Sequence, residues 1–271
     1  MARRRKMNQE IESTMKESSN EVSGAGHRIN VGALLSEKKP PSQSFLVWLI
    51  GDTPLICHAW SQKAKLEMLK KQVGSTKSAK EKRDPETDFL DSLYEMRDGI
   101  YGFPITAVKK ALLSFAHKDR GIARSDAQQS IWLNAEMIST RPALAGAICD
   151  MPLIRIYGSK PQMREDMVRI GTGLRKTANL AYRAQFTTWG LRITGNMNPL
   201  IVEAHQLLFL LRNAGSGAGI GDWRNEKGGW FGGFHVADLE EQQEWEKFAK
   251  NEGPLPKPRP SSESPMMEAA E

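Results

Sequence analysis

Residues 184–236 read AQFTTWGLRITGNMNPLIVEAHQLLFLLRNAGSGAGIGDWRNEKGGWFGGFHV, and this stretch decides the fold. Residues 184–194 alternate apolar and polar side chains closely enough to predict a β-strand. Asn198 and Pro199 then suit the N-cap and first turn of a helix, and leucines at helical spacing follow them. Residues 232–236 predict a second, short strand. A strand, a helix, a glycine-rich loop and a strand in this order form half of a ferredoxin-like unit.

Two predicted helices carry an apolar face, because their apolar residues recur every three or four positions. In the helix that starts at Asn198, this face consists of Leu200, Ile201, Ala204, Leu207, Leu208 and Leu211. In a helix predicted over residues 104–118, it consists of Ile105, Val108, Ala111, Leu112, Phe115 and Ala116. Together with the strands, these helices predict an α+β fold class with a ferredoxin-like core.

The N-terminal half contains a predicted β-hairpin. Residues 45–50 form an apolar run, FLVWLI, residues 51–54 are turn formers, and residues 55–60 would be the return strand. Residues 63–71 have the apolar spacing of a helix. Residues 74–88 are almost wholly polar and predict a linker or a flexible loop.

The two ends of the chain differ in composition from its middle. Residues 1–28 begin with a basic cluster and hold few apolar residues, so we expect a disordered basic tail. Residues 251–271 are rich in proline, which disfavours regular structure and predicts a second disordered tail. A folded domain over residues 29–250 is left, and its length suits one domain with inserted lobes.

The 271-residue chain has a net charge of +6 and a pI of about 9.3. The surplus is local, because the stretch from Arg155 to Arg192 holds eight basic residues and only two acidic ones, Glu165 and Asp166. A concentrated positive charge favours contacts with phosphates, and a merely solvated face is the alternative.

Several classes of protein lack their sequence signals here. No apolar run is long enough to cross a bilayer, and no apolar stretch of a secretory signal follows the basic N-terminus. Cys57 and Cys149 are the only cysteines and the histidines are scattered, so we expect no zinc or other metal site. A cytoplasmic location is the corresponding expectation.

The glycine-rich run over residues 215–234 is not a cofactor loop. The dinucleotide fingerprint G-x-G-x-x-G needs a preceding strand, and both its spacing and its context fail here. The chain also lacks the Gly-Lys dipeptide of a Walker A loop, so we expect no cofactor. Because glycine has no Cβ, the run instead allows the close approach of a polymer backbone or of a neighbouring subunit.

Aromatic and basic side chains interleave in the same run. Trp223, Trp230 and Phe231 offer flat surfaces for stacked bases, and Arg224 and Lys227 offer charge for phosphates. This combination is typical of proteins that bind a single strand. The alternative is that the tryptophans plug the protein's core.

Residues 101–112, YGFPITAVKKAL, resemble a helix start of the RAMP superfamily, in which a proline and small residues precede a lysine and an alanine-leucine pair. These RRM-like proteins include the backbone subunits of CRISPR surveillance complexes. Residues 219–221 through 232–234 resemble the glycine-rich C-terminal loop of the same superfamily. Residues 106–108 replace its serine pair and Lys110 replaces a glycine, which indicates a divergent relative such as one carried by a virus or a mobile element.

The resemblance implies an RRM-like core with inserted lobes, for which residues 74–95 and 120–155 are the candidates. It also implies a homo-oligomer that coats a single RNA strand, with DNA as the alternative, inside a larger ribonucleoprotein. Lys109 would lie near the strand, and Gly219 and Gly221 would line the loop. The full set of expected nucleic-acid-binding residues is Lys109, Lys110, Arg164, Arg169, Arg175, Lys176, Gly219, Gly221, Trp223, Arg224 and Lys227.

Catalysis is not expected. Some members of the superfamily cleave RNA with an aspartate in a flexible loop, and Asp84, Asp88 and Asp91 lie in or near such a loop. Carboxylates in a polar loop are usually only solvated, however, and no signature of a serine hydrolase is present. We therefore expect a non-catalytic binding protein. The alternatives are an assembly protein with the glycine- and tryptophan-containing loop as its subunit interface, and an RNA-cleaving member of the same fold.

Overall fold

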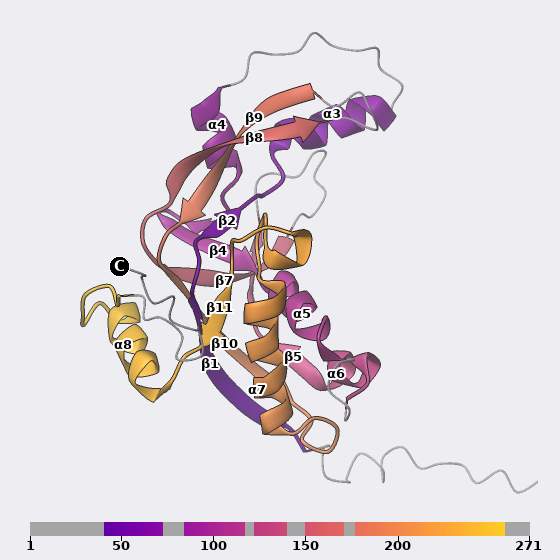
Figure 1. Ribbon diagram of the computed structural model, residues 1–271, viewed down its shortest axis with the longest axis vertical. Coiled ribbons are helices and arrows are strands. Elements are labelled where there is room, and N and C mark those ends of the chain that lie inside the picture. The colour runs from indigo at the N-terminus through magenta and orange to yellow at the C-terminus, as the bar shows by residue number, and fades with distance from the viewer. Residues whose placement is uncertain (1–40, 73–83, 117–121, 140–149, 171–176, 258–271) are drawn as a thin grey trace, which may run out of the picture. The chain divides into compact units, whose positions relative to one another are not determined.

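The computed structural model describes residues 41–72, 84–116, 122–139, 150–170 and 177–257, which are coloured along the chain in Figure 1. The expected N-terminal tail and the last part of the C-terminal tail lie outside these ranges, so both expectations of disorder remain predictions. Most of the polar run over residues 74–88 lies outside them as well.

The main sheet is antiparallel. Its central strands are, in spatial order, β11 (Phe234–Val236), β1 (Gln43–Gly51), β10 (Trp189–Met197) and β7 (Asp150–Gly158). Along the chain, α5 (Ile105–Leu113) comes between β1 and β7, and α7 (Ala204–Asn213) comes between β10 and β11. Two β-α-β halves therefore interleave in one sheet, which confirms the predicted α+β class and its ferredoxin-like core.

Further strands extend this sheet. The strands β4 (Ile100–Pro104) and β3 (Glu95–Arg97) lie beyond β7. β5 (Ile131–Leu133) pairs with β10, and β6 (Glu136–Ser139) pairs with β7. The expected insertion over residues 120–155 contains β5, β6 and the short helix α6 (Arg124–Ser130), between α5 and β7.

A second sheet consists of β2 (Leu55–Cys57), β9 (Thr177–Phe186) and β8 (Gln162–Ile170). Helix α4 (Pro85–Asp91) packs on β9 and belongs to the expected insertion over residues 74–95. Helix α3 (Gln62–Gln72) confirms the helix predicted over residues 63–71. These elements lie together at the top of Figure 1, and the β8–β9 hairpin is a further excursion that no sequence pattern predicts.

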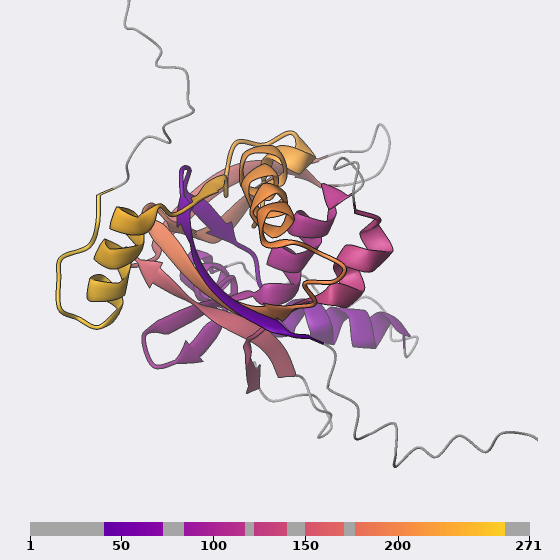
Figure 2. The same ribbon diagram turned by 90° about the horizontal axis from the view of Figure 1, so that it is seen from below.

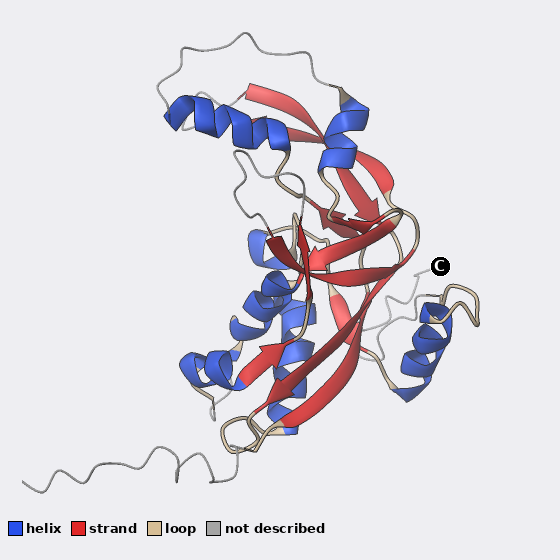
Figure 3. Ribbon diagram, turned by 180° about the vertical axis from the view of Figure 1, so that it is seen from behind, coloured by secondary structure: helices blue, strands red, loops and turns tan. Residues whose placement is uncertain are grey.

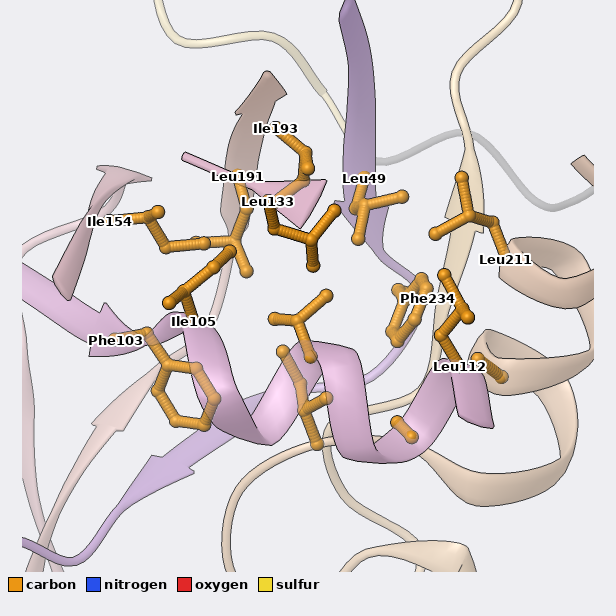
Figure 4. Close-up of a cluster of buried hydrophobic side chains, with 14 of the residues drawn as sticks. Leu49, Phe103, Ile105, Leu112, Leu133, Ile154, Leu191, Ile193, Leu211 and Phe234 are labelled. Carbon is orange, nitrogen blue, oxygen red and sulfur yellow. The ribbon is translucent and has the colours of Figure 1, made fainter. Parts of the chain in front are cut away.

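Helices α5 and α7 cover one face of the main sheet and enclose the core. Val108 and Leu112 of α5 are fully buried, as is Leu211 of α7. They pack against side chains of the sheet, several of which Figure 4 shows around α5: Leu49, Leu191, Ile193 and Phe234. Full burial of a leucine-sized side chain contributes about 1.5–3 kcal/mol, so this apolar layer is the main source of stability.

A C-terminal helix, α8 (Leu239–Ala249), covers the opposite face of the sheet, as Figures 2 and 3 show. Its buried Trp245 packs on Trp48 of β1, with ring centroids 5.8 Å apart. Gly190 of β10 makes room for the indole, because a Cβ at that position would lie 2.8 Å from it. The indole N–H of Trp48 also donates to Glu246 Oε1 of α8, at 3.0 Å.

Two strand predictions are wrong, one in its pairing and one in its length. Residues 45–50 and 55–60 do not form a hairpin, because β1 pairs with β10 and β11 whereas β2 pairs with β9. The chain between them passes from one sheet to the other. Residues 184–194 are not a single strand either, because the chain turns at Thr187 and Thr188, between β9 and β10.

The helix predicted at Asn198 begins later than expected. Asn198 forms a turn, in which its Oδ1 accepts from the N–H of Leu200 at 3.0 Å. Helix α7 starts only at Ala204, where Glu203 and Gln206 form a capping box. The buried face shifts with it. The buried residues of the helix are Leu207, Leu210 and Leu211, and the residues wrongly expected to be buried are Leu200, Ile201, Ala204 and Leu208.

Helix α7 offers a matched pair of leucines, since Leu211 is fully buried and Leu208 is 39% exposed. We expect Leu211→Ala to lower the free energy of unfolding by about 2–5 kcal/mol. Leu208→Ala should lower it by less than about 1 kcal/mol. Urea denaturation measures both changes, and an equal loss at the two positions would contradict the observed orientation of the helix.

His235 of β11 holds the start of α8 against the sheet. Its Nδ1 lies 2.6 Å from Asp52 Oδ1, and its Nε2 lies 3.2 Å from Glu241 Oε2 in the first turn of α8. The hydrogen bond and charge of Asp52, with a smaller effect from Glu241, raise the pKa of His235 above its ordinary value despite partial burial.

This raised pKa makes the stability depend on pH. Protonated His235 stabilises the fold fully below the ordinary histidine pKa of about 6.5, and the effect is lost as the pH rises through the higher pKa of the folded state. We expect the urea midpoint to fall as the pH rises above about 6.5, and His235→Gln to reduce that fall. His205→Gln is the control, because the His205 side chain is 74% exposed. An unchanged pH dependence in His235→Gln would exclude this role.

Candidate functional site

A cleft of about 320 Å³ lies where the glycine-rich run meets the start of α5. We call it the α5 cleft. Its lining residues are the N-cap Pro104 with Ala107, Lys110 and Ala111 along α5, residues 219–222, Arg224 and Glu226 from the glycine-rich run, and His58, Tyr94 and Phe103. The cleft thus brings together two stretches that lie far apart in the sequence.

The glycines of residues 215–234, the glycine segment, let the chain pack closely on itself. A Cβ at Gly215 would lie 1.8 Å from the carbonyl oxygen of Phe234. A Cβ at Gly232 would lie 1.7 Å from the carbonyl oxygen of Ile220. The N–H of Ile220 donates to Gly232 O at 2.9 Å. The N–H of Gly232 donates to Pro54 O at 2.9 Å. Glycine is required at these crossings because no side chain fits between the two backbones.

Gly219 and Gly221 both line the α5 cleft and adopt positive φ angles of 68° and 84°. The chain itself fills the space that their side chains would take. A Cβ at Gly219 would lie 3.1 Å from Gly232 O, and one at Gly221 would lie 2.6 Å from Ile56 O. These glycines therefore serve the fold first, and it is their peptide backbone that forms the surface of the cleft.

Asp222 fixes the glycine segment to the second sheet. Its N–H donates to Ile56 O of β2 at 3.0 Å. Its Oδ2 lies 3.3 Å from His58 Nδ1 and 3.1 Å from Arg183 Nε of β9, and its Oδ1 accepts from the N–H of Trp223 at 3.0 Å. The His58 ring, the Arg183 guanidinium and the Trp223 N–H hold the pKa of this carboxyl below its ordinary value, against the effect of partial burial.

The two cations that line the α5 cleft differ in their surroundings. Arg224 is bound within the glycine segment, with Nε and Nη2 donating to Glu226 Oε2 at 2.9 and 2.6 Å. Lys110 is exposed and forms no ion pair with a described residue, although its charge, beside the larger effect of Arg224, helps to lower the pKa of Glu226. Lys110 is therefore the cation of the cleft that can neutralise an incoming anion.

Lys109, the neighbour of Lys110, lies outside the α5 cleft. Its Nζ sits 5.9 Å from the centroid of the Trp132 ring on β5, which is a cation–π contact. Successive residues of a helix are rotated by about 100° about its axis, so adjacent lysines point in different directions. The lysine of α5 that lines the cleft with the glycine segment is Lys110.

Trp223, Trp230 and Phe231 form an aromatic cluster on the glycine segment. The Phe231 ring lies 6.4 Å from that of Trp223 and 5.9 Å from that of Trp230, measured between centroids. The guanidinium of Arg164, on β8, lies 4.6 Å from the Phe231 centroid. Because Trp230 is 69% exposed and Trp223 is also exposed, the alternative in which these tryptophans plug the core is wrong.

The basic stretch between Arg155 and Arg192 is distributed over both sheets. Arg183 pairs with Asp222, and Arg164 pairs with Asp166 at 2.9 Å. Arg192 pairs with Glu246 of α8 at 2.7 Å, on the far side of the main sheet. Among the other expected contacts, Arg169 is exposed on β8 and Lys227 is exposed in a short 3-10 helix, η4 (Asn225–Lys227). Arg175 and Lys176 lie outside the described residues.

The aspartates weighed for catalysis belong to a helix. Asp84 caps α4, because its carboxylate accepts from the N–H groups of Glu86 and Thr87 at 3.4 and 3.3 Å. Asp88 and Asp91 lie within α4. Within the described ranges, no group of three or more acidic, histidine or cysteine residues could hold a metal ion. No helix in the described part of the chain is both long and apolar enough to span a membrane.

His58, Tyr94 and Asp222 line the site although no motif singles them out. The hydroxyl of Tyr94 donates to His58 O at 3.2 Å, which ties together two segments of the cleft wall. Burial, with a smaller effect from nearby acidic groups, raises the pKa of Tyr94 to about 12, so the hydroxyl is neutral. The glycine segment contains two carboxylates, Asp222 and Glu226, and no sequence signal distinguishes Asp222 from Glu226.

Comparisons with known proteins give little similarity. No model of a protein family and no curated protein matches the sequence. Among solved structures, the chain is similar to the crystal structure of Cmr6 from Pyrococcus furiosus, with a TM-score of 0.35 and 6% identity over 73% of this chain and 99% of that chain. This is a weak resemblance at the level of the fold and assigns no family.

Gly232 and Gly228 form a matched pair for testing the glycine segment, because both have a positive φ. A Cβ at Gly232 would collide with Ile220 O, whereas open space surrounds that position at Gly228. We expect Gly232→Ala to lower the free energy of unfolding by more than about 3 kcal/mol. Gly228→Ala should lower it by about 1–2 kcal/mol. Urea denaturation measures both, and small, equal losses would contradict the close packing.

Proposed function

We propose that the protein binds single-stranded nucleic acid, with RNA as the preferred strand, and that it does so without catalysis. The strand's backbone would lie in the α5 cleft and its bases on the aromatic cluster. The observation that carries this proposal is the combination of the exposed Lys110 in the cleft with the exposed Trp230 on the same glycine segment that lines it.

The charges of the α5 cleft support a phosphate contact at Lys110. A phosphate is attracted by positive charge that is not already neutralised. Glu226 is engaged by Arg224, and Asp222 is engaged by Arg183 and His58. Glu226 is bound mainly by Arg224 and interacts with Lys110 only through its charge, so the exposed Lys110 ammonium is available to bind an anion.

The aromatic cluster supports base stacking. Stacking of a base on an aromatic side chain contributes about 1–3 kcal/mol, and it tolerates any sequence because every base has a flat face. Phe231 is held in place before binding, since Arg164 lies over its ring and its backbone bridges to that of Arg224. Arg224 lines the α5 cleft, so the cluster and the cleft are two parts of one surface.

Assembly along the strand within a ribonucleoprotein is the finer part of this proposal. It comes from the resemblance of residues 101–112 and of the glycine segment to the RAMP motifs. Subunits that coat a strand would form oligomers that lengthen with the nucleic acid. The competing function is an assembly protein in which the exposed tryptophans contact another subunit, and it requires assembly without nucleic acid.

The adjacent lysines of α5 give a matched test of the site. We expect Lys110→Ala to weaken the binding of a labelled single-stranded oligonucleotide and to reduce the slope of log K against log salt concentration by about 0.7, which corresponds to one phosphate contact. Lys109→Ala should leave both quantities unchanged, because Lys109 faces Trp132. Fluorescence anisotropy over a series of salt concentrations measures both variants.

The same experiment separates the alternatives. Wild-type affinity in Lys110→Ala, together with wild-type affinity in Trp230→Ala, would show that the site is assigned wrongly. A nuclease-treated protein that oligomerises and binds no oligonucleotide would favour the assembly protein. Cleavage of the labelled RNA would favour the enzyme, and intact RNA after prolonged incubation with divalent metal would exclude it.

A further inference from the structure

A second and larger hollow, of about 650 Å³, adjoins the α5 cleft. His58 and Tyr94 line both hollows, so the two are neighbours on one surface. Their common wall is fixed by hydrogen bonds, since Tyr94 donates to His58 O and the N–H of Ala59 donates to Ser92 O at 2.9 Å. The volume lies within the range of about 300–1,000 Å³ that is typical of ligand pockets.

Apolar and aromatic side chains form half of the lining of the second hollow. Leu93, Met96 and Met151 form part of its surface, and Trp60 lies at its edge with 63% of its surface exposed. Within the described part of the chain, no other aromatic ring packs against Trp60. An exposed indole beside a partly apolar hollow is a surface on which a flat ligand can stack.

The charges around this hollow are balanced. Two cations, Lys65 and Arg97, and two acidic residues, Glu95 and Asp98, belong to its lining. Arg97 forms an ion pair with Glu136 at 3.1 Å. The hollow therefore differs from the α5 cleft, where Lys110 forms no ion pair with a described residue. Because the positive and negative charges of the lining are equal in number, the hollow has no preference for a phosphate. Its apolar and aromatic side chains suit an uncharged, flat group. The nucleobase is such a group.

We propose that this hollow, the Trp60 hollow, binds a base of the same nucleic-acid strand that lies in the α5 cleft, and that Trp60 stacks on that base. The inference rests on the proposed function, to which it adds a separate base-binding subsite. The backbone between the two subsites would pass over His58 and Tyr94. A strand must then be long enough to occupy both hollows before it reaches full affinity.

Oligouridylates of stepwise increasing length test this subsite, with binding followed by fluorescence anisotropy. For wild-type protein we expect affinity to rise once the strand reaches the Trp60 hollow. Trp60→Ala should lose about 5- to 150-fold of affinity for the longer strands and none for the shortest that bind. Trp60→Phe should recover part of the loss, because it keeps an aromatic ring. Trp132→Ala is the matched control, since Trp132 is 67% exposed and lines neither hollow.

Strands with abasic positions at either end distinguish the base from the backbone. If a base occupies the Trp60 hollow, removing the bases at one end weakens wild-type binding as much as Trp60→Ala does and does not weaken the variant further. A Trp60→Ala protein that binds long strands as tightly as the wild type would overturn the inference and leave the proposed function standing. A wild-type protein that binds no strand of any length would overturn the proposed function itself.

Discussion

Between Arg183 Nε and Asp222 Oδ2, 3.1 Å apart, an ion pair joins the glycine segment to the second sheet. Without it, the segment would be held on that side by backbone contacts such as the hydrogen bond from Asp222 N–H to Ile56 O. Both partners are largely shielded from water, and removing one partner of such a pair leaves a charge that the protein solvates poorly. The wall of the α5 cleft depends on this contact, because Asp222 lines the cleft and also contacts His58, another lining residue.

The site is assembled from parts of the chain that have different origins in the fold. The ferredoxin-like core supplies α5 with Lys110, and the connection from α7 to β11 supplies the glycine segment. The β8–β9 hairpin contributes Arg164 and Arg183, which stand opposite each other in the strand register and contact the glycine segment at Phe231 and at Asp222. The excursion between β1 and α5 contributes His58, Tyr94 and Trp60. Both hollows are lined by residues of the excursion between β1 and α5, while the β8–β9 hairpin contacts the glycine segment that lines the α5 cleft.

The sequence predicts those features that depend on local patterns. The α+β class and the buried side of α5 follow from periodicity and from the order of the predicted elements, whereas the closeness of the glycine segment to α5 is implied only by the resemblance to the RAMP motifs. Prediction from sequence fails where tertiary contacts determine the helix boundary or the position of a side chain. Pro199 indicates a helix start, yet a capping box at Glu203 sets the start of α7 and rotates its buried face. The resemblance points to Lys109 as the lysine near the strand, and only the packing of α5 shows that Lys110 lines the cleft. His58 and Tyr94 belong to no motif, because the pairing of β2 with β9 brings their segments together.

The burial of both faces of β1 has a consequence for its sequence. In a ferredoxin-like sheet with helices on one side only, alternate residues of this strand would face water and could be polar. Here Leu49 faces the core beneath α5 and α7, while Trp48 and Ile50 are enclosed beneath α8. This explains why residues 45–50 form an unbroken apolar run, which is typical of strands that are buried on both sides. A polar substitution at Trp48 or Ile50 would therefore weaken the contact of β1 with α8. The unbroken apolar run FLVWLI is thus explained by its contact with α8, a helix almost two hundred residues further along the chain.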